Sequence, residues 1–275
     1  MSKRLTRGQF LRHLTLGLAT TLVVGACRQE NDSPSKPRTT NSNILRVATA
    51  PASPPFSFQG EDGKIQGFDI DLIKAIGETA GLEVRFKFTR FERLIPLVEE
   101  GKVDAAISAI SITAKRLQTI DFSVPYFKSG LAIAIRKDNT QITDVKSLEG
   151  KIVGVKIGTT GADKAAQIPN AQLSFFDFAS FQLQELRNGT VDAVIRDGPI
   201  LQYSIAQSGF NNLKILEQLL SEEYYGIAVP QNSPKLPAVN KALNVLREGG
   251  SYAQIYQKWF DDRPPTLPNS VEEIF

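Results

Sequence analysis

The sequence predicts an α/β protein with two similar lobes, each a mostly parallel sheet flanked by helices, joined by a two-strand hinge. Strand and helix patterns alternate along most of the 275 residues, which favours parallel sheets with right-handed crossovers. A second observation is an internal similarity: Leu97–Ile107 (LVEEGKVDAAI) and Leu186–Ile195 (LRNGTVDAVI) share a Gly, Val-Asp-Ala and a closing Ile. Each fits a helix that ends at Gly and leads into a buried strand. Because Gly-x-Val-Asp is common at such turns, this similarity indicates two lobes only if the flanking strands and helices also occur twice.

The same order of strands and helices does occur twice. Ile70, Ile73 and Ile76 lie on one face of the first expected helix. The elements expected in the first lobe are a strand at Leu45–Thr49, a helix at Phe68–Ala80, a strand at Val84–Phe88, a helix at Leu94–Glu100 and a strand at Val103–Ile107. Those expected in the second are a strand at Ile152–Val155, a helix at Ala162–Ala166, a strand at Leu173–Phe176, a helix at Phe181–Asn188 and a strand at Val191–Ile195.

Two connections between the lobes are expected to form a hinge. The chain leaves lobe 1 near Tyr126–Gly130 and returns near Glu222–Gly226, where Tyr224–Val229 reads as a strand rejoining lobe 1. Helices are expected at Pro234–Arg247 and Tyr252–Phe260, and the Pro-rich end after them reads as a loose tail. This division assigns 44–127 and 226–262 to lobe 1, 128–225 to lobe 2 and 263–275 to a C-terminal tail.

The N-terminus has the pattern of an export signal over residues 1–26. A basic start containing Arg4 and Arg7 precedes the apolar stretch Leu14–Val24, and small residues precede Cys27. The order Val-Gly-Ala-Cys resembles a bacterial lipobox, in which this Cys carries the lipid and becomes the mature N-terminus, so that the protein is anchored to the membrane. A resemblance to a twin-arginine motif lacks the second Arg, which favours ordinary secretion. Residues 27–43 are expected to form a flexible tether.

The composition excludes several classes of function. The formal net charge is +3, from 32 basic and 29 acidic residues, but the expected signal holds four basic residues and no acid, which leaves 28 against 29, or −1. The charge therefore gives no indication of nucleic-acid binding. The single His, His13, and the single Cys, Cys27, lie in or beside the signal. We therefore expect no catalytic His or Cys, no metal site, no cofactor and no disulfide.

The segment Ser108–Ser123 has the pattern of an anion-binding site. After the strand ending at Ile107, Thr113 can cap a helix that carries Lys115 and Arg116 in its first turn. Cations are favoured at the opposite end of a helix. An Arg here, beside free backbone N–H groups, therefore fits a clamp for a carboxylate or phosphate. The alternative is an Arg exposed to solvent.

Other candidate residues lie where strands end, at the edge where ligands gather in parallel sheets. The two Val-Asp-Ala strands are expected to present their last residues to a shared cleft: Ser108 and Ala109 in one lobe, Arg196 and Asp197 in the other. The alternative for Asp197 is a helix cap before Pro199. Lys156 precedes a Gly-Thr-Thr-Gly turn whose N–H groups can bind a carboxylate. Phe91 stacks on an aliphatic ligand side chain or belongs to the core.

Motifs along most of the chain resemble one known family, the solute-binding proteins of polar amino acid ABC importers (family 3), and most closely its glutamine-binding branch. The matching segments run from about Leu45 to Phe260 and include Gly67-Phe68-Asp69-Ile70-Asp71-Leu72, Gly101-Lys102-Val103-Asp104, Ile112-Thr113 with Arg116, Ile120-Asp121-Phe122-Ser123-Val124-Pro125-Tyr126, Gly158-Thr159-Thr160 and Tyr252–Phe260. The resemblance implies the type II periplasmic binding protein fold, which closes on its ligand like a Venus flytrap.

The resemblance also implies roles for the backbone groups of an amino acid ligand. Arg116 would bind the α-carboxylate together with the N–H groups of Ser111 and Thr160. The α-ammonium would be bound by Asp197, the carbonyl of Ala109 and the hydroxyl of Ser111.

The ligand side chain would stack on Phe91, and Lys156 would reach its end. Two positions depart from the family: Ala50 replaces an Asp that often contacts the side chain, and Ser53 replaces an aromatic residue that usually stacks on it. If Arg116 and Asp197 neutralise the backbone charges, a buried Lys156 remains unpaired, which is costly. This favours glutamine or glutamate over basic amino acids.

The expected function is that of a non-enzymatic binding subunit, a monomer in the periplasm or at the cell surface. Its expected partners are an amino acid, the permease subunits of an ABC transporter and, through the lipid on Cys27, the membrane. The alternative is an enzyme on the same fold, such as a dehydratase of a small carboxylate like prephenate or arogenate. It would need a cleft carboxylate free to act as acid or base, and no second acid lies among the matched positions.

Overall fold

The structure is a computed structural model, and it describes residues 43–275. The predicted signal peptide, the predicted lipidation site Cys27 and the predicted tether, apart from its last residue, lie outside the described residues. The described residues 43–275 belong to one compact unit. Within the described residues, no helix is long and apolar enough to cross a membrane.

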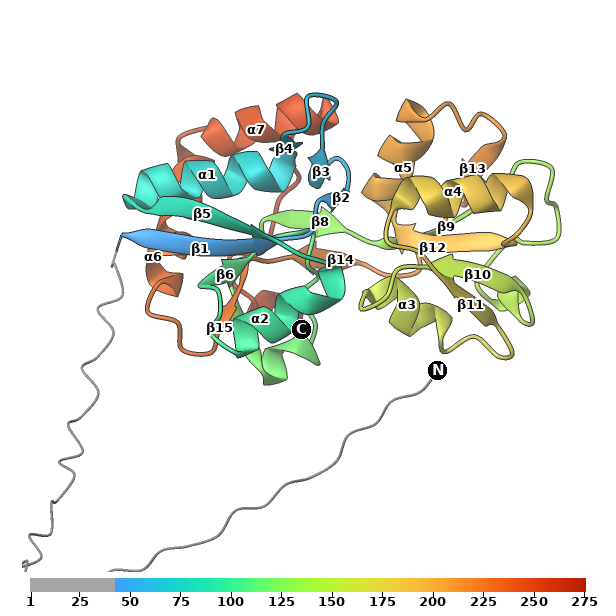
Figure 1. Cartoon of the computed structure of the whole chain (residues 1–275), viewed down its shortest axis with the longest axis horizontal. Helices are drawn as coiled ribbons and strands as arrows, with labels where there is room; N and C mark the ends of the chain where they lie inside the picture. The colour runs from blue at the N-terminus through green and yellow to red at the C-terminus, as the bar shows by residue number, and fades with distance from the viewer. Residues whose placement is uncertain (1–42) are drawn as a thin grey trace, which may run out of the picture. The chain divides into compact units, whose positions relative to one another are not determined.

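Lobe 1 is built on a five-stranded sheet in the order β5-β1-β6-β15-β7. The strands are β1 (Ile44–Thr49), β5 (Glu83–Phe88), β6 (Ala105–Ala106), β7 (Ile120–Phe122) and β15 (Ala228–Pro230). Strand β1 runs parallel to β5 and β6, and β15 is antiparallel to its neighbours. Figure 1 shows α1 (Phe68–Ala80) and α7 (Ser251–Phe260) on one side of the sheet and α2 (Leu94–Glu99) on the other. Helix α6 (Leu236–Glu248) packs on α1.

Helix α1 has the predicted bounds. Its buried face includes Ile70, Ile73 and Ile76, and Gly81 ends it in a left-handed conformation with φ of 68°. At its start, Gly67 has φ of 137°, and a Cβ there would lie 2.1 Å from the carbonyl oxygen of Phe56. This Gly therefore lets α1 approach a small antiparallel sheet that was not predicted. Its strands are β2 (Ala52–Ser53), β3 (Ser57–Gln59) and β4 (Ile65–Gln66).

Lobe 2 is built on a second five-stranded sheet in the order β11-β10-β12-β9-β13. Its elements are β9 (Leu131–Arg136), β10 (Ile152–Val155), α3 (Thr160–Ala165), β11 (Gln172–Phe175), α4 (Ala179–Asn188), β12 (Ala193–Asp197), α5 (Gly198–Gln207) and β13 (Leu213–Ile215). Strands β10, β11 and β12 are parallel, as predicted. Strands β9 and β13 were not predicted, and β9 runs antiparallel to both of its neighbours, β12 and β13. Strand β9 fits this central position because its residues up to Ile135 are buried.

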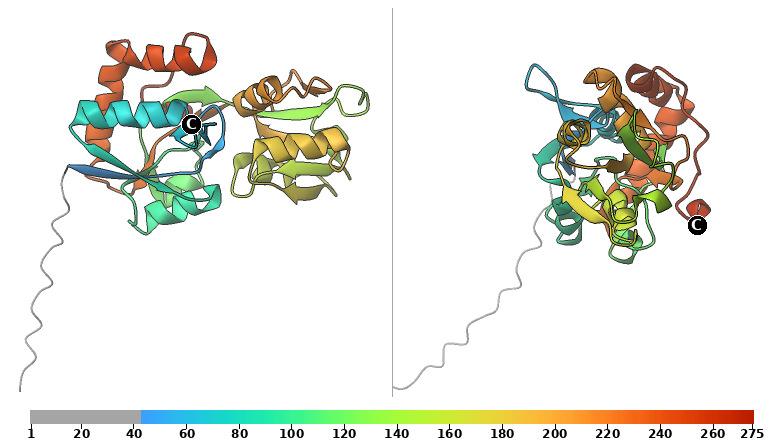
Figure 2. Two further views of the ribbon diagram at one scale, coloured as in Figure 1. Left: turned by 45° about the horizontal axis from the view of Figure 1, so that its top comes forward. Right: turned by 90° about the vertical axis from the view of Figure 1, so that its right-hand side faces the viewer.

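Two short strands, β8 (Phe127–Ser129) and β14 (Glu223–Tyr225), pair antiparallel between the lobes (Figure 1). The single strand predicted at Tyr224–Val229 is instead two strands, β14 and β15. The break falls at Gly226, where a Cβ would lie 2.9 Å from side-chain atoms of Ile112 and Phe122. In the left view of Figure 2, the red C-terminal helices lie beside the cyan helix of lobe 1, because the chain has returned there.

Two expectations from the sequence are wrong. The helix expected after Thr113 is only a 3-10 turn at Arg116–Gln118, in which the N–H of Arg116 donates to Thr113 Oγ1 over 3.2 Å. A turn of three residues has no significant helix dipole. Attraction of an anion to this segment therefore depends on the guanidinium of Arg116.

The Pro-rich end of the chain is not a loose tail. Leu267 packs on the core around α1, and Val271 and Ile274 pack on the core around α2. A 3-10 turn at Glu272–Ile274 ends the chain. These widely spaced apolar side chains cover lobe 1, which the composition of the segment did not indicate.

Candidate functional site

A cavity between the two lobes collects most of the predicted site residues. Lobe 1 contributes Ser53, Phe91, Ser108, Ala109, Ser111 and Arg116, and lobe 2 contributes Lys156, Thr159, Thr160, Asp197 and Ile200. We call this space the interlobe cavity. These residues surround about 290 Å³, part of it open to solvent. Only about 10 Å³ of this space is accessible to a water-sized molecule, which is room for about one water, so a larger molecule enters the interlobe cavity only if the surrounding side chains move apart.

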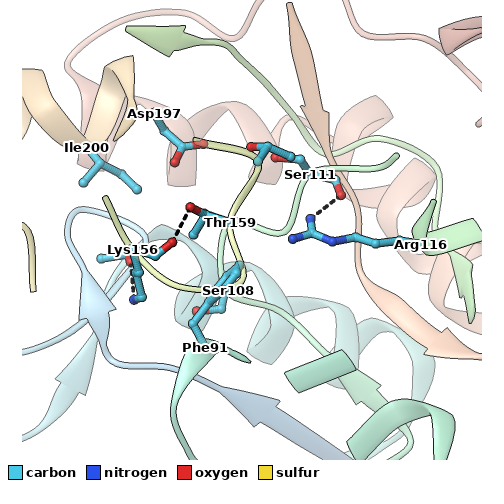
Figure 3. Close-up of a pocket in the computed structure, with 11 residues that line it drawn as sticks. Phe91, Ser108, Ser111, Arg116, Lys156, Thr159, Asp197 and Ile200 are labelled. Carbon is cyan, nitrogen blue, oxygen red and sulfur yellow. Dashed lines mark hydrogen bonds between the residues drawn. The ribbon is translucent and has the colours of Figure 1, made fainter. Parts of the chain in front are cut away.

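Arg116 crosses from lobe 1 toward lobe 2. Its guanidinium donates to the carbonyl of Ser111 over 2.7 Å and to the carbonyl of Gly158, in lobe 2, over 3.0 Å. Figure 3 shows Arg116 and Asp197 reaching the cavity from different sides, with Ser111 between them. Burial lowers the pKa of Arg116, while Glu223, Asp163 and Asp197 act in the opposite direction. A half-buried guanidinium that binds only neutral carbonyls can still bind a carboxylate.

Asp197 is the last residue of β12 and the residue before α5. Its side chain makes no capping bond to α5, although Pro199 lies in the first turn. Instead its carboxylate accepts a hydrogen bond of 2.5 Å from the hydroxyl of Tyr225. The side chain is therefore not used as a cap, and Asp197 is buried, with 7% of its surface exposed. No hydrogen bond from another residue of the described range reaches its other oxygen, which is therefore available to a cation.

The turn at Ala109 is fixed by a buried carboxylate. Ala109 has φ of 51°, which is uncommon for a residue with a side chain. Its N–H donates to Asp69 Oδ2 over 2.7 Å. Burial raises the pKa of Asp69 to about 7, although this bond acts in the opposite direction. Asp69, the second residue of α1, thus supports the cavity wall from behind.

Two buried cations lie near Ser53. Lys156 Nζ lies 3.5 Å from Ser53 Oγ, and the guanidinium of Arg196 donates to the same oxygen over 3.0 Å. Burial lowers the pKa of Lys156 to about 7, and the positive charge of Arg196 contributes to this shift. Burial also lowers the pKa of Arg196 to about 10. Among the described residues, neither side chain has a carboxylate within ion-pair distance.

Phe91 belongs to both environments that the sequence allowed. It packs in the core around α2 and also lines the interlobe cavity. Lys156 Nζ lies 5.2 Å from the centre of its ring, and the guanidinium carbon of Arg116 lies 5.9 Å from it. Both cations therefore make cation–π contacts with the Phe91 ring.

Helix α3 begins at the cavity and is held by its own hydroxyl groups. Thr159 caps the helix, accepting from the N–H of Ala162 over 3.2 Å and donating to the carbonyl of Lys156 over 2.7 Å (Figure 3). Thr160 donates its hydroxyl to Glu223 over 3.0 Å. The predicted start of this helix, Ala162, was two residues late, so Thr159 was not recognised as its cap.

Of the nine predicted ligand-binding residues, all but Ala50 line the interlobe cavity. Ala50 is buried behind it, where its N–H and carbonyl both bond with Ser108 Oγ. Thr159, Ile200 and Glu223 were not predicted. Arg196 was expected at the cleft because it lies at a strand end, but its bond to Ser53 was not predicted. The pair of acids before Tyr224, in an otherwise strand-like connection, was the signal for Glu223. Within residues 43–275, no cluster of acidic side chains could hold a metal ion.

Comparison with known proteins identifies the family. Residues 45–262 match the family model of the bacterial extracellular solute-binding proteins, family 3. The chain belongs to this family. The named relatives of this family 3 protein are binding proteins rather than enzymes.

The names of three of these relatives mention histidine, arginine and glutamine. The chain is 31% identical to a probable histidine-binding protein of Campylobacter jejuni, over 87% of this chain and 94% of that protein. It is 32% identical to the ABC transporter arginine-binding protein 1 of Escherichia coli, over 75% of this chain and 86% of that protein. An ancestral arginine-binding protein bound to glutamine is 41% identical, with a TM-score of 0.73, covering 80% of this chain and 99% of the other.

Proposed function

We propose that this family 3 solute-binding protein is the substrate-binding subunit of an amino acid ABC importer. It captures a polar amino acid between its lobes by hinge closure and delivers it to a membrane permease. The names of the relatives support an amino acid ligand and an ABC transporter. The division into lobe 1 (44–127 and 226–262) and lobe 2 (128–225) is part of this proposal, since β8 and β14 would act as its hinge.

One observation carries the proposal. Arg116 and Asp197 enter the same cavity from different lobes, and neither is neutralised there by an ion pair with a described residue. An α-amino acid carries one anion and one cation on the same carbon, so it can pair with both side chains at once. Because each lobe holds only part of these contacts, binding favours the closed arrangement.

We further propose glutamine or glutamate as the ligand. The end of the cavity beyond Phe91 contains the buried cation Lys156, with the buried cation Arg196 behind Ser53. A basic ligand side chain would add a third positive charge to this region, which is unfavourable in a poorly solvated site. A carboxylate or amide oxygen would accept hydrogen bonds from Lys156. Two relatives are named instead for histidine and arginine. The choice of glutamine or glutamate therefore depends on the charges of Lys156 and Arg196 in this chain.

A thermal-shift screen of the twenty amino acids tests the proposal, because a ligand that binds the folded state raises the unfolding midpoint. We expect the largest shifts with L-glutamate and L-glutamine, followed by calorimetry for their affinities. Tight binding of arginine or lysine without glutamine or glutamate would reject the side-chain assignment. No shift with any amino acid would reject the function.

We also propose that the protein is a monomer in the periplasm or at the cell surface, anchored through a lipid on Cys27 after removal of residues 1–26. The support is the lipobox-like order Val-Gly-Ala-Cys and the polar tether that follows it. Replacing Cys27 by Ser should move the protein from the detergent phase to the aqueous phase in a phase-separation assay. Equal partitioning of both forms would reject the anchor.

A further inference from the structure

Glu223 occupies a position that belongs to neither sheet. It is the first residue of β14, one of the two strands between the lobes. Its carboxylate accepts hydrogen bonds from Ser111 Oγ over 2.5 Å, from Thr160 Oγ1 over 3.0 Å and from Ser221 Oγ over 3.0 Å. Ser111 comes from lobe 1 and Thr160 from lobe 2, so one carboxylate joins both lobes from the connecting strand.

The carboxylate does not itself line the interlobe cavity, whereas Ser111 and Thr160 do. Any effect of Glu223 on a bound molecule therefore passes through these two hydroxyl groups and through its charge.

A hydroxyl group has one hydrogen to donate and two lone pairs that accept. The hydroxyl groups of Ser111 and Thr160 both donate their hydrogen to Glu223. Only the lone pairs of these two oxygens remain available to a molecule in the cavity. Such oxygens can accept from an ammonium group but cannot donate to a carboxylate. They therefore match the cationic end of the ligand, on the side where Asp197 lies.

The charge of Glu223 acts in the same direction. Burial and the nearby Asp197 raise the pKa of Glu223, whereas the bonds from the three hydroxyl groups favour its ionised form. Two acidic groups near one side of the cavity make that side favourable for a cation.

We propose that Glu223 is a positioning residue, which fixes the hydroxyls of Ser111 and Thr160 as acceptors for the ligand ammonium and thereby couples ammonium recognition to lobe closure. This inference rests on the proposed function. It adds that the connecting strand, rather than the cavity wall alone, determines which end of an amino acid binds on the Asp197 side.

The variant Glu223→Gln tests this inference with L-glutamate and 2-hydroxyglutarate as probes, measured by calorimetry and by competition. The amide can donate to Ser111 or Thr160, which turns a hydroxyl hydrogen toward the ammonium. We expect L-glutamate to bind about 10- to 100-fold more weakly. The affinity for 2-hydroxyglutarate, whose hydroxyl can donate or accept, should change by less than about threefold.

Glu222→Gln is the matched control. Glu222 is the neighbouring acid, but it is exposed and pairs with Lys128 and Tyr224. Its variant should bind both probes like the wild type. The double variant Ser111→Ala with Glu223→Gln should lose less affinity than the sum of the single losses, since one residue acts through the other.

The outcomes separate this inference from the proposed function. If the wild type binds L-glutamate and Glu223→Gln binds it equally well, the inference is overturned and the function stands. If Glu223→Gln loses the same affinity for both probes, or if its unfolding midpoint falls so far that the protein is partly unfolded in the assay, Glu223 has a structural role and the inference is also overturned. If the wild type binds no amino acid, the proposed function fails and this inference falls with it.

Discussion

Arg116 and Asp197 are each held by neutral partners, carbonyl groups for Arg116 and a tyrosine hydroxyl for Asp197. Their charges are therefore positioned without being consumed. At the scale of single residues, this is what distinguishes a prepared binding site from a structural ion pair. The pair Arg46 and Asp104 shows the contrast, because its two side chains meet at 2.8 Å and neutralise each other.

Replacing Arg116 by Ala should abolish binding of L-glutamate while leaving the fold intact. The loss of the charged, half-buried partner of the ligand carboxylate is expected to weaken binding by about 100-fold or more. Calorimetry measures this loss, and a thermal unfolding midpoint within about 3 °C of the wild type would show that the fold is retained. Lys115→Ala is the control, because Lys115 is exposed and its nearest acid, Asp163, lies 3.8 Å away. Unchanged affinity in Arg116→Ala would reject the assigned site.

Asp69 should make the stability of the protein depend on pH. Its pKa in the folded state is about 7, above the usual value near 3.8, so the folded protein holds this proton where the unfolded chain has lost it. Its favourable contribution is full below about pH 4 and is lost as the pH rises through 7. Asp69→Asn lacks this term.

We therefore expect the stability of the wild type, relative to Asp69→Asn, to fall by up to about 4 kcal/mol between pH 4 and pH 8. Urea denaturation of both proteins at several pH values measures the difference. Because all other titrating groups are shared, a difference that stays constant with pH would contradict the shifted pKa.

The pair of connecting strands sets the main constraint at the scale of elements. Gly130 follows β8, and a Cβ at this position would lie 2.3 Å from the backbone carbonyl oxygen of Ser221, just before β14. A backbone atom cannot move aside as a long side chain can. The two connections therefore come this close only because residue 130 has no side chain.

The variant Gly130→Ala should be destabilised by about 1–3 kcal/mol, the usual cost of overpacking. Gly198→Ala is the matched control, because a Cβ there would meet its nearest atom at an ordinary 3.6 Å. Denaturant unfolding should leave this control within about 0.5 kcal/mol of the wild type. Equal stability of both variants would show that the connections tolerate separation.

The elements also show what the sequence could predict. Helix α1 was located to the residue, because its apolar spacing and the Gly at its end are local signals. The parallel strands were found for the same reason, and their carboxyl ends correctly indicated where the cavity lies. Strands β9 and β13 were missed, since β9 pairs with β12 and β13, which lie far along the chain. The small β2–β4 sheet pairs locally but was missed because its strands are only two or three residues long.

The site was predictable to a similar depth. Residues at strand ends, such as Asp197, follow from the topology of a parallel sheet. The contacts of Arg196 and Glu223 do not, because each partner lies on the other lobe or on a separate connection. Ala50 was assigned to the cavity from the family pattern alone, and its small side chain leaves it in the core instead.

Lys156 connects the site to the molecule as a whole. Its side chain belongs to lobe 2, but it is buried against Ser53 of lobe 1, and burial is the main reason that its pKa falls to about 7. The charged groups that also affect its pKa are Arg196, which lowers it, and Asp177, Asp197 and Glu92, which raise it. The charge of Lys156 in this state is therefore a property of the assembled lobes.

The affinity for L-glutamate should consequently fall as the pH rises from 6 to 9, because the neutral amine no longer attracts the ligand carboxylate. The expected limit is about tenfold per pH unit above pH 7. Calorimetry across this range measures the slope. Lys156→Met should bind more weakly at pH 6 and lose most of the slope, and an equal slope in both proteins would assign it to another group.

The order of strands in lobe 1 has a consequence for how the protein is made. Strand β15 lies between β6 and β7 in that sheet, and α6 and α7 cover α1. The sheet of lobe 2, in contrast, uses one continuous stretch from Leu131 to Ile215. A ribosome delivers the chain from its N-terminus, and sheets that need distant segments form late. We therefore expect lobe 2 to be able to fold on its own early, and lobe 1 to stay unfinished until the segment from β15 onward has been made.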